Sequence, residues 1–193
     1  MPHSLPPHAS PFQRGIWVTE RLGGHHGVFH MPVLLSFDRV DADALARAVS
    51  TVTARHPVLS QVFVERGGSL VAEPGTAPVL DVVDASEDCA QSREKRLAED
   101  AARPLDLQAG PLARFTLYRG RGEAAELLAV VHHAVFDGES KDVLVADLAT
   151  AYAQALGGPA QAADRSPSTP PAPLDPDPDL VRRAADRYGP RWA

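Results

Sequence analysis

Apolar and polar residues alternate with two different periods in the first part of the chain, which predicts alternating strands and helices. Residues 28–37 form an apolar run typical of a strand. Asp41 is then placed to cap a helix, and apolar residues at helical spacing indicate that this helix ends near Arg55. Shorter apolar runs predict further strands near residues 58–64, 69–72 and 79–83.

A charged helix and a hairpin are expected in the middle of the chain. The helix begins at a cap, Ser86, and continues to Arg103, because Pro104 lacks the backbone N–H that would extend it. Residues 112–118 and 126–131 are rich in apolar and β-branched side chains and indicate two strands joined by a glycine-containing turn. The middle of the chain therefore continues the α/β alternation.

The last predicted helix lies beyond these strands and ends at the pair Gly157-Gly158. Its apolar stripe comprises Leu144, Leu148, Ala151 and Ala155. We expect one domain over residues 1–156. Frequent prolines among alanine, serine and aspartate predict an extended linker over residues 157–178, and residues 179–193 are expected to form a short helix.

These elements together indicate a mixed α/β fold, a two-layer sandwich of helices on a sheet. A chain of 193 residues with 44% hydrophobic residues can bury one core. Its net charge of −6, without a basic cluster, argues against nucleic-acid binding. No apolar run approaches the ~20 residues that span a membrane, and a signal-peptide pattern is absent, so no membrane association and a cytoplasmic location are expected. The single cysteine, Cys89, agrees with this location and is interpreted as structural or incidental.

The segment that carries candidate chemistry directly follows the apolar strand that ends near residue 131. There the sequence places adjacent histidines, His132 and His133, ahead of Asp137 and Gly138. An imidazole, with an ordinary pKa of about 6.5, can exchange a proton near neutral pH. Because strand side chains alternate between faces, we expect His133 to act as base or hydrogen-bond donor and His132 to point away as a packing or orienting residue. Asp137 is expected to orient an imidazole or, preferentially, to bury its charge against an arginine and so fix the loop.

Two other histidine sites are weaker candidates. The pair His25-His26 lies in a glycine-rich loop without a Cys, Asp or Glu ligand in the same segment. His56 is expected to make a structural hydrogen bond at a helix end rather than to act in catalysis. We therefore predict no metal site.

Four segments, taken together, make the chain resemble a known family. They are Ser10-x-x-Gln13 with Trp17, residues 40–63 with Arg55-His56-Pro57, residues 104–112 with Gly110-Pro111-Leu112, and the His-His-x-x-x-Asp-Gly motif. In this order they resemble the amino-terminal lobe of the condensation domains of nonribosomal peptide synthetases, in the chloramphenicol acetyltransferase-like superfamily. The resemblance covers roughly residues 10–156. It implies one lobe of that fold, a mixed, largely antiparallel sheet covered by helices.

The resemblance also implies acyl transfer with no cofactor bound by the chain itself. Family members join an acyl group, held as a thioester on the phosphopantetheine arm of a peptidyl or acyl carrier domain, to an amine or hydroxyl held on another carrier. His133 would position the nucleophile, take up its proton or stabilise the tetrahedral intermediate, and these roles stay open. Gly138 matches a position where a side chain would crowd the tunnel and where a backbone amide can face the reacting centre.

The chain departs from the family pattern at two positions. The family usually places an arginine four residues after the histidine of its Arg-His segment, where it can pair with the motif aspartate, but here that residue is Ser60. Arg55 and Arg114 are the substitute partners considered for Asp137. Glu139 replaces a bulky residue, which is expected to alter the tunnel wall rather than the chemistry.

Family domains have two similar lobes with the tunnel between them, and 193 residues suffice for one. The competing explanations are an excised piece, a half-domain completed by a carboxy-terminal lobe on another polypeptide, and self-association like that of the trimeric acetyltransferase relatives. A non-catalytic module that binds a carrier or a synthetase is an alternative function, and a free-standing trimeric acyltransferase is another. The sequence leaves open the donor, the acceptor and whether an amide or an ester is formed.

Overall fold

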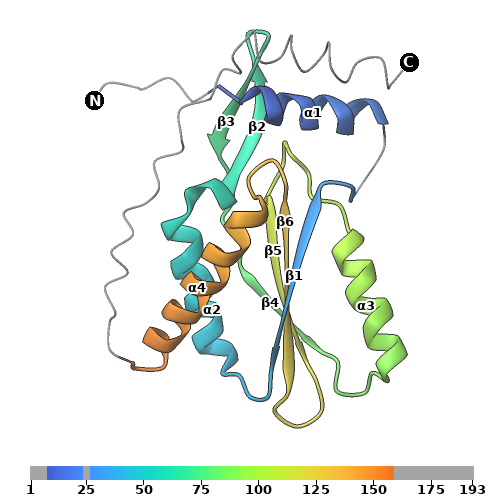
Figure 1. The fold of residues 1–193 in the computed structure, drawn as a ribbon, viewed down its shortest axis with the longest axis vertical. Coiled ribbons are helices and arrows are strands. Elements are labelled where there is room, and N and C mark those ends of the chain that lie inside the picture. Colours follow the sequence, from blue (N-terminus) through green and yellow to red (C-terminus); the bar gives the residue numbers. More distant parts are fainter. Residues whose placement is uncertain (1–7, 24–26, 159–193) are drawn as a thin grey trace, which may run out of the picture.

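A four-stranded sheet forms the centre of the molecule (Figure 1). The computed structural model describes residues 8–23 and 27–158. The strand order is β1-β6-β5-β4, in which β4 and β5 run parallel and the other neighbours run antiparallel. The strands are β1 (His30–Phe37), β4 (Leu80–Asp84), β5 (Ala113–Arg119) and β6 (Ala125–His132). The predicted mixed, largely antiparallel sheet is confirmed.

Helices cover both faces of this sheet (Figure 1). The helices α2 and α4 pack against each other on one face, and α3 packs on the opposite face, which adds a layer to the two that the sequence predicted. The helix α1 lies across one end of the sheet, beside a separate hairpin of β2 and β3. The bounds are Pro11–Gly23 for α1, Ala42–Arg55 for α2, Ala90–Ala102 for α3, Gly138–Ala155 for α4, Gln61–Arg66 for β2 and Ser69–Pro74 for β3.

The strand β6 runs through the middle of the core and delivers the histidine pair to the end of the sheet. Its side chains alternate between two buried clusters, with Leu127, Ala129 and Val131 facing α2 and α4, and Leu128 and Val130 facing α3. His132 continues the α3-facing row as the last strand residue, and it pairs with His30 of β1. His133 follows directly after the strand. Strand periodicity therefore separates the two imidazoles.

Local signals set the start and the end of α2 as the sequence predicts. The Asp41 side chain accepts a hydrogen bond from the Ala44 amide at 2.8 Å, so Asp41 satisfies one of the unpaired N–H groups at the start of the helix. The helix ends at Arg55, and His56 forms its carboxy-terminal cap. The apolar side of α2 is fully buried against the sheet, through Leu45, Val49 and Val52.

Two element predictions differ from the structure, and one element was not expected. The strand expected near residues 58–64 begins only at Gln61, because the chain after Pro57 first forms a short 3₁₀ turn, Pro57–Ser60. The charged helix begins at Ala90 rather than after Ser86, because the Ser86 amide instead donates to the Asp84 side chain in a turn. The helix α1 was not predicted from the sequence.

Gly110 is required by its backbone conformation and by its surroundings. Its φ of 61° lies in the left-handed region that favours glycine, and an added Cβ would lie 2.8 Å from a methyl carbon of Val62. The Gly110-Pro111-Leu112 segment can therefore pass close to the β2–β3 hairpin before it enters β5. Apart from Gly157 and Gly158, the expected linker 157–178 and the expected helix 179–193 lie outside the described residues, as do His25 and His26.

Candidate active site at the histidine segment

The histidine segment comprises residues 132–137, from the last residue of β6 to the cap of α4. Its first residue, His132, is fully buried at the end of β6 and is hydrogen-bonded through both ring nitrogens. The Ala134 amide donates to its Nδ1 atom at 3.1 Å, so Nδ1 carries a lone pair. The proton is therefore on Nε2, which donates to the Glu20 carboxylate of α1 at 3.0 Å. Burial lowers the pKa of His132, although the Glu20 carboxylate opposes the shift. His132 is thus held as a neutral ring with one tautomer.

His133 has the opposite tautomer and lies at the surface of the segment, where it is partly exposed. Its Nδ1 lies 2.6 Å from the Phe136 carbonyl oxygen, which can only accept, so Nδ1 carries the proton. The Phe12 ring packs edge-on against the imidazole at 5.3 Å between centroids. The neutral ring therefore presents a lone pair on Nε2, as a base requires.

Asp137 caps helix α4 and is exposed. Its Oδ1 accepts from the Ser140 amide at 2.8 Å and from the Ser140 hydroxyl at 2.6 Å. These hydrogen bonds lower the pKa of Asp137. The expectation of a carboxylate buried against an arginine is wrong, because the helix amide and the hydroxyl stabilise this charge at the surface.

Arg55 lies with His56 on the carboxylate of Asp147, a nearly fully buried residue of α4. The distances to Asp147 are 3.2 Å from the Arg55 guanidinium and 2.6 Å from Nε2 of His56. This cluster joins the end of α2 to the middle of α4. Arg55 therefore does not contact Asp137, and His56 makes the structural hydrogen bond at a helix end that its position predicted.

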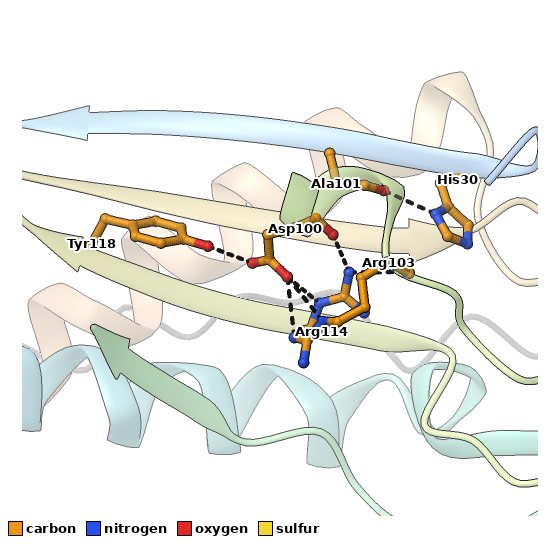
Figure 2. Close-up of polar contacts among 6 residues, drawn as sticks. All are labelled: His30, Asp100, Ala101, Arg103, Arg114 and Tyr118. Atoms are coloured by element: carbon orange, nitrogen blue, oxygen red, sulfur yellow. Dashed lines mark hydrogen bonds and ion pairs between the residues drawn. The ribbon is translucent and has the colours of Figure 1, made fainter. Parts of the chain in front are cut away.

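Arg114 lies on the other face of the sheet, where it joins β5 to the end of α3 (Figure 2). Its Nε donates to the Asp100 carboxylate at 2.9 Å, and the same guanidinium also contacts the backbone carbonyl oxygens of Asp100 and Arg103. The Tyr118 hydroxyl donates to Asp100 at 2.7 Å. Burial raises the pKa of the Tyr118 phenol, and the hydrogen bond to Asp100 adds to the shift. Arg114 thus fixes α3 rather than Asp137.

Gly138 is the first residue of α4, so its amide belongs to the four N–H groups that lack a partner within the helix. A Cβ built at Gly138 meets no atom within 4 Å. Among the described residues, therefore, nothing would be crowded by a side chain at this position. The amide and the positive end of the helix dipole lie next to the histidine segment in the chain.

The contribution of helix α1 to this site was not predicted from the sequence. Ser10 and Gln13 form a reciprocal capping box, in which each side chain accepts from the backbone amide of the other residue, at 2.9 and 3.2 Å. The Gln13 side chain also donates to the Ala134 carbonyl at 2.9 Å. The Ser-x-x-Gln spacing is itself a signal for a helix start and could have located α1.

A hollow of about 370 Å³ lies beside the segment, between it and the Arg55-His56 turn. It is lined mainly by apolar side chains, with His56 and acidic residues among them; the lining includes Val58, Leu59, Val135, Phe136, Asp137 and Glu139. Over the described ranges, no cluster of histidine, cysteine, aspartate and glutamate is arranged to hold a metal ion. None of the helices in residues 8–23 and 27–158 is long and apolar enough to cross a membrane.

Comparisons with known proteins identify one family. The model of the condensation-domain family matches residues 7–168. Phosphinothricin tripeptide synthetase PhsC of Streptomyces viridochromogenes is 35% identical over 143 residues, which are 70% of this chain and 13% of that protein. The isonitrile lipopeptide synthase of Mycobacterium tuberculosis is 34% identical over 167 residues, which are 84% of this chain and 6% of that protein.

Solved structures share the fold. The starter condensation domain of rhizomide synthetase RzmA gives a TM-score of 0.76 at 20% identity, over 83% of this chain and 42% of that chain. The first condensation domain of the calcium-dependent antibiotic synthetase gives a TM-score of 0.72 at 26% identity, over 83% of this chain and 40% of that chain. The chain thus spans less than half of these solved domains and a small part of the curated relatives it matches.

Proposed function

The chain belongs to the condensation-domain family of nonribosomal peptide synthetases, and from this premise we propose that it supplies the histidine-bearing lobe of an acyltransferase. The observation that carries the proposal is the tautomer of His133. Its Nδ1–H is engaged by the Phe136 carbonyl, which leaves the Nε2 lone pair without a donor among the described residues. A partly exposed imidazole with one unprotonated nitrogen suits proton transfer from an attacking amine or hydroxyl.

The proposed reaction joins an acyl group and a nucleophile, both carried on phosphopantetheine arms. The nitrogen or oxygen attacks the thioester carbonyl and forms a tetrahedral oxyanion, while His133 Nε2 takes up the nucleophile's proton. The C–S bond then breaks, and the thiolate leaves with a proton returned from the imidazolium. Amide or ester and free thiol are the products. Because both substrates are held in one place, proximity contributes much of the acceleration.

Gly138 is proposed to assist the oxyanion. Its amide is at the start of α4, where unpaired N–H groups and the helix dipole favour negative charge. The absence of a side chain at Gly138 is proposed to matter only when a second lobe or a further copy supplies the opposite wall of the site. In the described part of the chain, no atom lies within 4 Å of a Cβ built at this position. His132, Asp137, Arg55 and Arg114 are proposed to act through structure alone.

A second lobe is proposed to complete the site, with carrier proteins as the partners that deliver the substrates. The hollow beside the segment is open to solvent on this chain, and the matched condensation domains are more than twice its matched length. A complementary carboxy-terminal lobe or further copies of the chain would supply the opposite wall. One observation favours the alternative, a non-catalytic carrier-binding module. Ser60 stands where the family pattern has an arginine, so Asp137 is held by Ser140 rather than by that arginine.

The test is acyl transfer by the chain joined to a complementary lobe, with C8-CoA as donor and Leu-SNAC as acceptor. Both compounds appear together in a structure of the RzmA starter domain with two substitutions. Product formation is followed by mass spectrometry for the parent chain, His133→Ala and a control, His8→Ala, which removes an exposed histidine. The proposal predicts at least a ~100-fold loss for His133→Ala alone. Product formation unaffected by His133→Ala would contradict the role proposed for His133, whereas a parent chain that forms no product with the complementary lobe present would favour the binding module.

A further inference from the structure

Three consecutive residues of the histidine segment each contact a different side chain of α1. Glu20 accepts from His132 at 3.0 Å, Phe12 packs edge-on against His133 at 5.3 Å, and Gln13 donates to the Ala134 carbonyl at 2.9 Å. Each of these contacts joins two residues that are more than 110 positions apart in the sequence. The helix therefore contacts the backbone and both imidazoles of the segment at once.

The two polar contacts come from one face of the helix. Gln13 and Glu20 are seven residues apart, which is close to two helical turns and about 10 Å along the axis. Ile16, between them on the same face, is buried in the cluster that also contains Ala134. The capping box at Ser10 and Gln13 sets the start of the helix, and so the positions of both side chains are set together. Glu20 is thus held against His132 by the same packing that places Gln13.

Glu20 and the Ala134 amide both favour the same tautomer of His132. An ionised carboxylate only accepts hydrogen bonds, so the ring nitrogen that faces it, Nε2, has to carry a proton. The other nitrogen, Nδ1, then accepts from the Ala134 amide at 3.1 Å. Without Glu20, the buried Nε2–H has no acceptor, and a ring that moved its proton to Nδ1 would face the Ala134 N–H, donor against donor. The Ala134 amide would lose its acceptor inside the core, at a cost that favours rearrangement of the segment.

We propose that Glu20 is a positioning residue, which holds His132 in its Nε2-protonated tautomer and thereby fixes the turn that orients His133. The inference rests on the proposed function of His133, and it extends that function to α1. His132 and Ala134 flank His133 directly, and the Phe136 carbonyl that orients the His133 ring lies two residues farther along the same turn. A shift of the Ala134 amide therefore changes the direction in which His133 Nε2 points.

The first test does not need catalysis. The 15N NMR signals of the imidazoles are recorded in the full chain and in Glu20→Ala and Glu20→Gln. The proposal predicts that Glu20→Ala loses the single Nε2-protonated form of His132 and shifts the His133 signals, whereas Glu20→Gln keeps both, because an amide oxygen still accepts. The control is Glu65→Ala, which removes the exposed ion pair of β2 with Arg21 of α1. This control should change neither histidine.

A folded Glu20→Ala chain with unchanged signals from both histidines overturns the proposal. If Glu20→Ala does not fold, Glu20→Asp decides the question, because it keeps the charge but shortens the reach by one carbon. The proposal predicts that this variant also loses the single tautomer, and retention of it overturns the proposal.

The second test uses the chain joined to a complementary lobe. Glu20→Ala is expected to lower kcat about ten- to hundredfold with KM nearly unchanged, since the misplaced group is His133 rather than a substrate contact. Glu20→Gln is expected to restore most of kcat. An unchanged kcat in Glu20→Ala, in a preparation where His133→Ala is inactive, contradicts the inference. If His133→Ala is fully active, the proposed function has failed. The NMR result then still decides whether Glu20 holds the tautomer of His132.

Discussion

His132 and His133 are neighbours in the chain, yet they lie in two regions with opposite properties. The region of His132 is buried, and both of its ring nitrogens are bonded within the protein. The region of His133 is partly exposed, and one nitrogen is bonded to the Phe136 carbonyl. The step from the last strand residue to the first turn residue produces this difference, because side chains alternate along a strand. A histidine pair thus divides into one ring that holds the segment and one that faces outward.

A similar contrast separates two carboxylates of α4, Asp147 inside the helix and Asp137 at its cap. Asp147 is buried and is held by Arg55 and His56, whereas Asp137 is exposed and is held by Ser140. A buried carboxylate requires a charged or strongly hydrogen-bonding partner, but an exposed one at a helix start needs only an amide and a hydroxyl. This contrast explains how the histidine turn forms although the arginine of the family pattern is Ser60.

The largest expected effect on stability is that of His132→Ala. The substitution leaves a cavity and removes the partner of the buried Ala134 amide and of Glu20, so we expect a loss of about 3 kcal/mol in the free energy of unfolding. His133→Ala is the matched control, with an expected change of about 0.5 kcal/mol or less, because its ring is partly exposed. Urea denaturation followed by circular dichroism measures both. Equal losses for the two variants would abolish the contrast between the regions.

A smaller effect is expected from pH. Burial lowers the pKa of His132, so the unfolded chain binds a proton at a higher pH than the folded chain does. The stability that neutral, buried His132 contributes is complete above the pKa of histidine in the unfolded chain, about 6.5. It is lost as the pH falls through the lower pKa of the folded chain. The unfolding free energy of the parent chain should therefore fall more steeply between pH 7.5 and 5.5 than that of His132→Gln, with both pH values chosen as about one unit either side of the unfolded value.

The result that would contradict this expectation is a parallel decline in the two proteins. The other histidines are present in both proteins, so the comparison isolates the contribution of His132. A parallel decline would mean that His132 takes up protons in the folded chain as readily as in the unfolded chain, and hence that it is not enclosed.

The smallest expected effect concerns the cap of α4. Asp137→Ala should cost about 1 kcal/mol, the usual contribution of a helix cap, and Asp137→Asn less, because its amide oxygen still accepts from Ser140. Hydrogen bonds from Ser140 lower the pKa of Asp137. The advantage of the parent over Asp137→Asn is therefore complete above about pH 3.9 and is lost as the pH falls through the lower folded value. A thermal melting series checks this, and an advantage that persists in strong acid would exclude the charge as its source.

The strand and its histidines could be predicted from the sequence because their signals are local. The apolar run of β6 and the alternation of side chains led to the correct separation of His132 from His133. The cap of α2 at Asp41 is equally local. The partners of Arg55 and Arg114 could not be predicted in this way, since Asp147 is 92 residues from Arg55 and Asp100 belongs to a different layer.

The helix α1 was missed for a physical reason. Only Ile16 is buried among its residues, while Phe12, Val18 and Leu22 are exposed apolar side chains, so the usual buried stripe is absent. In the fold it is held by Ile16 and Trp17, which pack in the cluster that contains Ala134, by polar contacts with the histidine segment and by its capping box. The Asp137-x-x-Ser140 spacing is likewise a capping signal in the sequence, although a buried ion pair was the preferred interpretation of Asp137.

The two adjacent histidines hold opposite tautomers, and 15N NMR of the unmodified chain, labelled at histidine and recorded near pH 7.5, tests this difference most directly. The expected result is a proton on Nε2 of His132 and on Nδ1 of His133, with a lone pair on Nε2 of His133. The same tautomer at both residues, or rapid exchange of His132 between its two forms, would contradict the division of roles on which the proposed function rests.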